Sequence, residues 1–487
     1  MGTLVFLASL CLSDYEITQA TLTMSESKVS SQRLESLQPL LGRSFSSKSE
    51  ALAEISSHIK TQDPNINDYE LGVAQFWVLK NAATGVLREH TFFYFLLSIM
   101  LAIIGGLLYI VPQFFDSLPG IKNNNIWFSS TMARGAIGIL IGVMFIAFYV
   151  LLYWFPQYIV NMVLLLDPVS YFIRNLPADQ WFLYGFLYTA TILVMGLRML
   201  AKYRHSRYHI VRTFSIMFFQ TIFAFILPSL MEHLSLPSMD LKNAWPLNYS
   251  FFADWNISHL LSSGNFGFFL FVWGIVLSVV LVPALTYFYG KRWYCSWVCG
   301  CGGLAETMGD PFRQLSDKSL KSWKIERFLI NGVLVFAVGM TFMQIVNYAS
   351  DGVLFGNYTW RVNQAYSFFI GAAFAGVVGT GFYPFMGNRV WCRFGCPLAA
   401  IMGIVQRFKS RFRITTNGGQ CISCGNCSTY CEMGIDVRAY AQRGENIVRA
   451  SCVGCGVCAA VCPRGVLKLE NGPAHDRFNL LESEAVN

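Results

Sequence analysis

The sequence predicts an α-helical polytopic membrane protein with seven or eight spanning helices and a small α+β domain at the C-terminus. Three observations support this prediction. The 487 residues are 54% hydrophobic and only 13% charged, whereas a soluble domain carries about 25% charged residues. Apolar runs close to the length of about 20 residues that a spanning helix needs recur from residue 91 onward. All but one of the 14 cysteines follow residue 290, in spacings typical of metal ligands.

Residues 1–90 are predicted to form a polar N-terminal tail. The opening apolar run has no Lys or Arg before it, so it matches a signal peptide poorly, and Met24 is an alternative start. Residues 24–70 are rich in Ser, Glu, Gln and Lys. This composition is typical of a mobile segment that contains at most a short helix.

We expect the transmembrane domain at residues 91–414. The apolar runs that predict spanning helices are 91–112, 133–155, 181–200, 211–231, 265–289, 327–348 and 366–385. Residues 158–173 are also apolar, but Asp167 and Pro168 interrupt the run. We interpret this segment as an interfacial or re-entrant piece, and if it spans, the helices number eight. Asp167 fits an interfacial loop better than a role in proton transfer.

The positive residues predict the orientation, because Lys and Arg prefer cytoplasmic loops. The stretches 201–212, 313–327 and 406–413 are basic and are expected at the cytoplasmic face. The stretches 232–262 and 349–364 carry few positive residues and are expected outside. The cysteine-rich C-terminus then faces the cytoplasm. The net charge of +8 indicates contact with membrane lipid rather than nucleic acid, since the basic residues flank apolar spans.

Two cysteine runs with identical spacing lie close to the C-terminus. Both read C-x2-C-x2-C-x3-C, and they comprise Cys421, Cys424, Cys427 and Cys431, then Cys452, Cys455, Cys458 and Cys462. Three thiolates in a tight turn can hold three corners of an iron–sulfur cubane. Paired zinc sites are the alternative interpretation. C-x2-C is also typical of zinc sites, but two identical C-x2-C-x2-C-x3-C runs are specific to iron–sulfur proteins.

Residues 415–470 therefore resemble a bacterial two-cluster ferredoxin domain, and 471–487 would follow as a C-terminal tail. The resemblance implies two [4Fe–4S] clusters, with the last cysteine of each motif serving the other cluster. The implied ligand sets are Cys421, Cys424, Cys427 and Cys462 for one cluster, and Cys452, Cys455, Cys458 and Cys431 for the other. One position departs from the family, because Glu432 follows Cys431 where the family has Pro. That change would affect a turn or a reduction potential while keeping the thiolate.

A second duplication lies at the predicted cytoplasmic edge of the membrane. GKRWYCSWVCG (290–300) and GNRVWCRFGCP (387–397) share Gly-x-Arg, an aromatic residue before Cys, and a second Cys four positions on. The matching pairs are Cys295 with Cys299, and Cys392 with Cys396. Residues four apart share a helix face, so two facing pairs would present four sulfurs. Such a set suits zinc, iron–sulfur or Cu(I). A redox-active dithiol and the packing of small buried residues are the alternatives.

Residues 265–470 resemble the NapH-type subunits of periplasmic nitrate reductase systems, the C-terminal half of NosR-type proteins, and the FixG/CcoG-type accessory proteins of cytochrome oxidase. In these families both membrane motifs read C-x3-C-P. The second copy keeps Pro397, whereas the first has Gly300 and then Cys301. Cys301 has no counterpart in the second copy, and we assign it no role.

The resemblance implies a membrane-bound iron–sulfur protein that relays electrons between the quinone pool or a cytoplasmic donor and a partner redox enzyme. The alternative is an accessory factor that reduces or handles copper for a respiratory enzyme. Either would lie in the bacterial cytoplasmic (inner) membrane with its ferredoxin domain in the cytoplasm. No catalytic residue is predicted. The sequence leaves open whether the chain is itself an enzyme and whether a quinone binds.

Other cofactor classes find little support. His205 and His209 are four apart but have several basic neighbours. We interpret them as a solvated face at the membrane surface rather than as haem ligands. No Walker loop or dinucleotide-binding fingerprint occurs, so nothing supports nucleotide binding.

Overall fold

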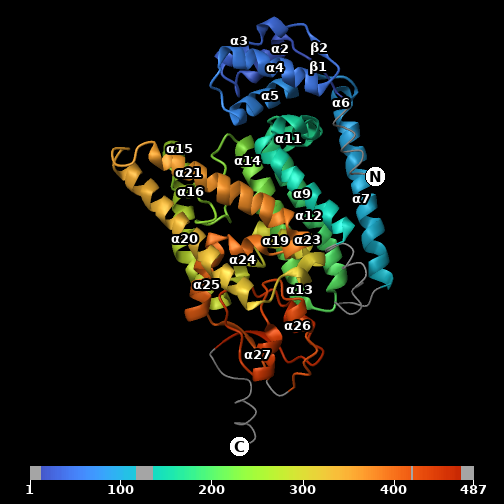
Figure 1. The fold of residues 1–487 in the computed structure, drawn as a ribbon, viewed down its shortest axis with the longest axis vertical. Coiled ribbons are helices and arrows are strands. Elements are labelled where there is room, and N and C mark those ends of the chain that lie inside the picture. Colours follow the sequence, from blue (N-terminus) through green and yellow to red (C-terminus); the bar gives the residue numbers. More distant parts are fainter. Residues whose placement is uncertain (1–12, 117–134, 418–419, 473–487) are drawn as a thin grey trace, which may run out of the picture. The chain divides into compact units, whose positions relative to one another are not determined.

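The computed structural model describes residues 13–116, 135–417 and 420–472. It is mostly helical (Figure 1) and divides into two compact units, which are described separately. Unit 1 comprises Met1–Pro112 and Ala147–Leu187, and unit 2 comprises Gln113–Ile146 and Tyr188–Asn487.

Seven helical segments in the described part of the chain are long and apolar enough to cross a membrane. They are Thr91–Pro112, Ala136–Trp154, Gln180–Lys202, Arg207–His233, Gly264–Tyr289, Leu320–Ala349 and Tyr358–Gly381. These segments coincide with the seven predicted apolar runs. The predicted fold class, a helical polytopic protein, is therefore confirmed.

In unit 1, residues 13–90 are folded, which differs from the mobile polar tail that their composition predicted. Three short strands form an antiparallel sheet in the order β2-β1-β3, from Asp14–Glu16 (β1), Ser44–Phe45 (β2) and Ala83–Thr84 (β3). The surrounding helices are α2 (Gln19–Ser25), α3 (Ser31–Glu35), α4 (Lys48–Gln62), α5 (Asp68–Ala82) and α6 (Val86–Glu89).

The polar composition of this region hides an amphipathic pattern. In α4 the buried residues are Ala51, Leu52, Ile55 and Ile59, which recur at helical spacing on one face. Phe76 of α5 is also fully buried. A few apolar residues at the right spacing thus supply a core that average composition does not reveal.

The segment predicted to be re-entrant contains only short helices. They are η3 (Pro156–Ile159), α10 (Val160–Leu164) and α11 (Asp167–Arg174), all too short to span a bilayer. Asp167 is buried and lies 2.7 Å from the Lys80 ammonium and 3.3 Å from the Arg88 guanidinium. It also accepts a hydrogen bond from the Ala178 N–H at 2.8 Å. These three partners give Asp167 a structural role within unit 1.

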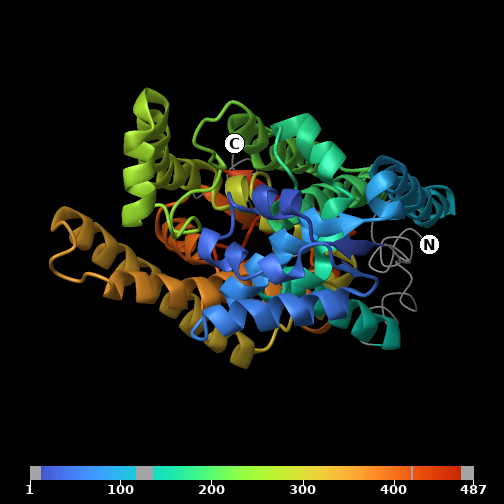
Figure 2. The ribbon, with the colours of Figure 1, turned by 90° about the horizontal axis from the view of Figure 1, so that it is seen from above.

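Three long helices carry the chain between the units, namely α7 (Thr91–Asp116), α9 (Ala136–Trp154) and α12 (Gln180–Lys202). Unit 2 continues with α13 (Arg207–Phe218), η4 (Phe219–Ile226), α14 (Leu227–His233), α15 (Asp254–Ser262), α16 (Gly264–Val276), η5 (Leu277–Leu281) and α17 (Val282–Tyr289). A helical hairpin follows, in which α20 (Leu320–Ala349) returns through α21 (Tyr358–Tyr366) and η7 (Ser367–Val378). Figure 2 shows the two arms of this hairpin side by side.

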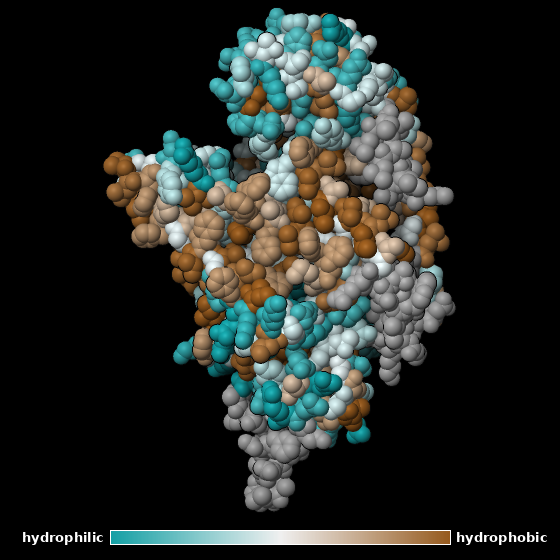
Figure 3. All heavy atoms as spheres, viewed as in Figure 1, coloured by the Kyte–Doolittle hydropathy of each residue, from teal (hydrophilic) through white to brown (hydrophobic). Residues whose placement is uncertain are grey.

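The surface of unit 2 changes character along these helices. Figure 3 shows a hydrophobic face over the hairpin and a hydrophilic one over the C-terminal domain. Phe328, Val335 and Phe342 of α20 are among the exposed apolar side chains. Exposed apolar residues on long helices are what a lipid-facing surface requires.

The C-terminal domain of unit 2 is small and mixed. Strands β4 (Phe412–Thr415) and β5 (Lys468–Asn471) pair antiparallel, with Arg413 opposite Glu470. Between them lie α26 (Asn426–Thr429), α27 (Val437–Arg443) and α28 (Val457–Ala460). The strands bring the two ends of the domain together, so the two cysteine motifs face a common interior.

Candidate functional site

The first cavity of the C-terminal domain is lined by four cysteine side chains. They are Cys421, Cys424, Cys427 and Cys462. Gly425 follows the second of them with a positive φ of 80°, and α26 begins at the next residue. Cys424 is exposed, whereas Cys427 is buried. This cavity therefore lies at the surface of the domain.

The second cavity is lined by the other four cysteines of the domain. They are Cys431, Cys452, Cys455 and Cys458. Gly456, with a φ of 82°, starts α28 as Gly425 starts α26. The Ile435 N–H points at the Cys431 sulfur at 3.4 Å. Main-chain N–H groups aimed at sulfur are one of the ways in which proteins tune an iron–sulfur centre.

Each cavity thus takes three cysteines from one motif and the last cysteine of the other, which is the grouping that the resemblance to a two-cluster ferredoxin implies. The assignment of individual ligands stays a prediction.

Burial favours metal ligation over free thiol chemistry in both cavities. Burial raises the pKa of Cys427 to about 11 and that of Cys452 to about 11. A thiol of this kind is inert at neutral pH. Metal binding releases its proton and supplies the positive charge that a buried thiolate needs.

The membrane-edge cysteines are also brought together. Cys295, Cys299, Cys392 and Cys396 are all buried in one cluster of side chains in unit 2. The two cysteines of each copy were expected to lie on one face of a single helix, and this expectation was wrong. The chain turns between the two cysteines of each copy, so that the second cysteine begins a new helix rather than continuing the first.

The two copies have the same backbone course. Gly290 and Gly387 both adopt positive φ, 65° and 93°, and a short helix follows each, α18 (Arg292–Cys295) and α24 (Val390–Phe394). The second cysteines then stand at the N-caps of α19 (Gly300–Thr307) and α25 (Pro397–Phe408). The Cys299 N–H bonds to the Tyr294 carbonyl, and the Cys396 N–H bonds to the Trp391 carbonyl. The duplication seen in the sequence is therefore a duplication of structure.

Cys301 belongs to this group, although the comparison of the two copies assigned it no role. Its thiol hydrogen-bonds with Cys299, which lowers the pKa of Cys299 to about 6 and raises that of Cys301 well above its usual value. Burial raises the pKa of Cys295 to about 12. The spacing Cys299-x-Cys301 was the available signal for this pairing.

A buried network of arginines and carboxylates lies beside both sets of cysteines. The Glu306 carboxylate of α19 forms ion pairs with three guanidinium groups. The N–O distances are 3.0 Å to Arg212, 2.7 Å to Arg313 and 2.7 Å to Arg389. Burial by itself would raise the pKa of Glu306, but the three guanidinium groups outweigh it and hold the pKa well below its usual range. Glu306 is therefore ionised and fully paired.

Glu432 ties the C-terminal domain into this network. Its carboxylate lies 2.8 Å from Arg313 and 3.2 Å from Arg389. Its main-chain carbonyl accepts a hydrogen bond from Ser316 at 2.6 Å. The residue that departs from the ferredoxin pattern is thus the one that docks the domain on the helices, which the sequence could flag but not explain.

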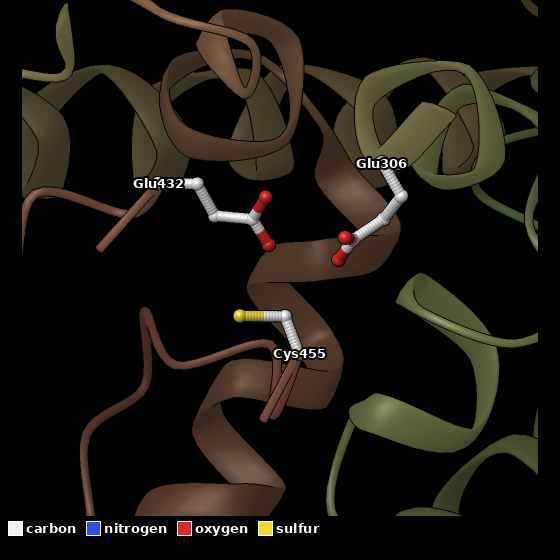
Figure 4. A group of neighbouring side chains, drawn as sticks. All are labelled: Glu306, Glu432 and Cys455. Carbon is white, nitrogen blue, oxygen red and sulfur yellow. The ribbon is translucent and has the colours of Figure 1, made fainter. Parts of the chain in front are cut away.

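The same arginines reach cysteine sulfur on both sides. Arg313 Nη1 lies 3.7 Å from Cys455 Sγ, and Arg389 Nη1 lies 3.7 Å from Cys392 Sγ. Figure 4 shows Glu306, Glu432 and Cys455 pointing toward one another, with ligand atoms within 4.8 Å. Because guanidinium groups already pair with both carboxylates, this group is an ionic junction rather than a cation site.

His209 differs from the solvated face that was predicted. It is buried, it stacks on Tyr203 with a centroid separation of 4.7 Å, and its Nδ1 lies 2.8 Å from the Ser206 hydroxyl. His205 is exposed, as predicted. The basic neighbours of His209 misled the prediction because Arg212 is itself buried and Lys202 is partly buried, in ion pairs with Glu306 and Asp310 respectively.

Family models match both regions of cysteines. A model described as a 4Fe-4S dicluster domain matches residues 420–467. A model described as a 4Fe-4S binding domain matches twice, at residues 270–319 and 367–415, and each match contains one copy of the membrane-edge motif. The chain is a polytopic protein with ferredoxin-type 4Fe-4S domains. The 4Fe-4S binding domains lie both in the C-terminal region and in the duplicated membrane region.

Curated relatives are distant and match only part of the chain. The candidate electron transport protein YccM of Escherichia coli (strain K12) is 26% identical over 158 residues, which is 30% of this chain and 43% of YccM. The methylamine utilization ferredoxin-type proteins MauN of Methylobacillus flagellatus and Paracoccus denitrificans are 25% and 24% identical over 165 residues, 32% of this chain and 53% of each relative. The chain thus spans about half the length of these relatives. No solved structure matches it.

Proposed function

We propose that the protein is a membrane-bound electron relay between the quinone pool or a cytoplasmic donor and a partner redox enzyme, as the resemblance to NapH-, NosR- and CcoG-type proteins implies. Two [4Fe–4S] clusters would be held by the eight cysteines of the C-terminal domain, and a further centre by Cys295, Cys299, Cys392 and Cys396. Such clusters supply one-electron storage and transfer.

The arrangement of the three cysteine groups carries this proposal. The membrane-edge cysteines are buried, the second cavity lies beside them across the Arg313–Glu432–Arg389 junction, and the first cavity exposes Cys424 at the surface. This order leads from the membrane helices to a face that a soluble partner can reach. A structural subunit would not need sulfur at both ends of such a path.

The chain contributes positioning and charge. Arg212 donates to the Cys455 carbonyl, Ser296 donates to the Val453 carbonyl at 2.8 Å, and Gln406 donates to the Cys452 carbonyl at 2.8 Å. These three bonds hold the second motif against the duplicated region. They fix the spacing between the two candidate centres, on which electron transfer depends.

The test is to purify the full chain anaerobically, count iron, and record EPR spectra during a redox titration with a quinol. We expect about eight irons in the C-terminal domain, additional iron at the membrane edge, and reduction by the quinol. Oxidation of one quinol releases two electrons and two protons, which matches two one-electron centres. Iron below about four per chain, or clusters reduced by dithionite but not by a quinol, would contradict the relay from the quinone pool.

The second candidate function is an accessory factor that handles copper. The pairing of Cys299 with Cys301 favours it, because closely spaced soft thiolates select Cu(I). Stoichiometric copper that is lost in both Cys295→Ala and Cys301→Ala would support this function. The relay predicts instead that Cys301→Ala keeps the metal, since Cys301 lies outside the four matched cysteines.

The protein would lie in the bacterial inner membrane with the C-terminal domain in the cytoplasm. The basic stretches next to the helix ends support this orientation. Labelling intact cells with a membrane-impermeant thiol reagent should leave Lys409→Cys, an added cysteine at an exposed position just after α25, unmodified until the cells are opened. Labelling in intact cells would show that the C-terminal domain faces the outside of the cell.

A further inference from the structure

A large cavity of unit 2 is distinct from the two cysteine cavities. It measures about 350 Å³ and lies between the start of α20, helix α25 and the loop before the second cysteine motif. Its lining includes five basic side chains, Lys291, Arg327, Arg393, Arg407 and Arg449. Glu326 is the one carboxylate among its lining residues. The cavity therefore carries a large excess of positive charge.

Lys291 is the most unusual of these cations. Its side chain is only 1% exposed, and no hydrogen bond or ion pair of its ammonium group is found in the described part of the chain. Only its main-chain N–H is bonded, to Gln406 Oε1 at 2.8 Å. A buried ammonium without a partner is strongly disfavoured, so a negative charge in the cavity would stabilise it.

Arg393 offers a second free donor to the same cavity. It is 3% exposed, its Nε lies 2.7 Å from Glu326, and its Nη1 donates to the Asp317 carbonyl at 2.8 Å. Its Nη2 is buried and has no partner in the described residues. Glu326 is already taken by Arg393 and by the Ser451 hydroxyl, so it cannot neutralise Lys291.

The rest of the lining is mostly apolar, with Asn331, Tyr440 and Ser451 as polar members, and it reaches the helix surface. Ile330 of α20 and Ile404 and Phe408 of α25 line the cavity, and the last two are among the exposed apolar residues of the protein. Helix α20 is one of the candidate spans. A ligand that fills the whole cavity therefore has a charged head beside Lys291 and an apolar tail along α20 and α25.

We propose that this cavity binds the phosphate headgroup of an anionic membrane phospholipid, with Lys291 and Arg393 as its charged hydrogen-bond donors. A phosphate accepts several charge-assisted hydrogen bonds and balances positive charge. A neutral carbonyl headgroup would accept hydrogen bonds but leave both charges unbalanced. Burial raises the pKa values of Cys295 and Cys452, and the charge of Lys291 opposes that rise, so both thiols lie within the field of Lys291. They offer nothing to Arg393 Nη2.

The test compares lipid retention by the full-length protein and by Lys291→Gln. Both are purified in detergent, exchanged into nanodiscs of phosphatidylcholine with a minor share of phosphatidylglycerol, and analysed by native mass spectrometry. We expect the wild type to select phosphatidylglycerol and Lys291→Gln to lose that selectivity by about tenfold or more, because a buried charge partner is removed. Lys409→Gln is the matched control, since Lys409 is an exposed cation just after α25 and outside the cavity lining.

Further arms decide between sources of the anion. Lys291→Arg keeps the charge and should retain most of the selectivity, and iron content shows that each variant has folded. Binding of inorganic phosphate by the wild type, without any selection of phosphatidylglycerol, would overturn the lipid assignment. A wild type that binds phosphatidylcholine and phosphatidylglycerol equally would overturn the proposal even if Lys291→Gln failed to fold.

Discussion

The chain contains two duplications of cysteine motifs, and they use the cysteines differently. In the C-terminal domain the copies exchange a residue, so that Cys462 joins the first cavity and Cys431 joins the second. At the membrane edge the two copies instead converge on one buried cluster, and their surroundings differ. Arg389 of the second copy pairs with Glu306 and Glu432, whereas Arg292 of the first stacks on Phe412 at 4.8 Å. Similar spacing therefore fixes the backbone, while burial fixes the chemistry around it.

The largest expected effect tests the exchange in the C-terminal domain. Cys431→Ala should remove the centre of the second cavity and leave the first, and Cys462→Ala should do the reverse, each lowering iron by about four per chain. The measurement is iron content with EPR of the remaining centre. Both variants keeping full iron, or each variant losing the centre of its own motif, would show that the cysteines are not exchanged.

The next effect separates the two membrane-edge copies. Arg389→Ala leaves two buried carboxylates short of a partner and should lower the free energy of unfolding by about 3–5 kcal/mol. Arg292→Ala removes cation–π contacts and should lower it by only about 1 kcal/mol. Denaturant titration of the purified protein in detergent measures both. Equal losses in the two variants would mean that the copies are energetically equivalent.

Acid should weaken the ionic junction around Glu306, whereas pH changes near neutrality should not alter the stability of the protein. Burial would raise the pKa values of Glu306 and Asp310, but their arginine and lysine neighbours hold both well below the ordinary values of 4.5 and 3.8. Because the folded pKa values are depressed, this stabilisation is complete above about pH 5. It is lost as pH falls toward the folded values, by up to about 1.4 kcal/mol per pH unit for each carboxylate.

Unfolding free energies measured between pH 8 and pH 3 check this expectation. The curve should be flat down to about pH 5 and then fall. Glu306→Gln should fall less steeply than the wild type, because one titrating group is gone. A decline that begins between pH 6 and 8 would point to other groups.

Local patterns in the sequence predicted most of the fold, and burial explains what they missed. The seven apolar runs and the two C-x2-C-x2-C-x3-C motifs are local patterns, and local patterns survive without knowledge of packing. The fold of residues 13–90 was missed because a small core needs only a few residues such as Ile55 and Ile59. The ion-pair partners of Glu306 and Glu432 are Arg212, Arg313 and Arg389, which come from three segments of the chain, so no spacing rule could find them. Only the substitution of Glu432 for Pro signalled the junction.

The smallest effect compares the two glycine turns that start α26 and α28. Gly425 and Gly456 have nearly equal φ values, 80° and 82°, so Ala at either position should lower stability by about 1–2 kcal/mol through the left-handed backbone alone. A Cβ at Gly425 would meet only the end of Arg438 at 3.9 Å. A Cβ at Gly456 would lie 2.8 Å from the Tyr208 ring, which is held by its hydrogen bond to the Gly454 carbonyl.

Gly456→Ala should therefore lower the free energy of unfolding more than Gly425→Ala does. The loss should exceed the roughly 1–2 kcal/mol expected from the left-handed backbone alone. The Gly456→Ala substitution should also shift the potential of the second centre, because Tyr208 and the Gly454 carbonyl must move beside Cys455. Gly425→Ala should change stability while leaving that potential unaltered. Paired unfolding and redox titrations measure the difference. Matching losses in both variants would mean that the surface turn and the buried turn constrain their cysteines equally, and that burial adds nothing to the shared motif.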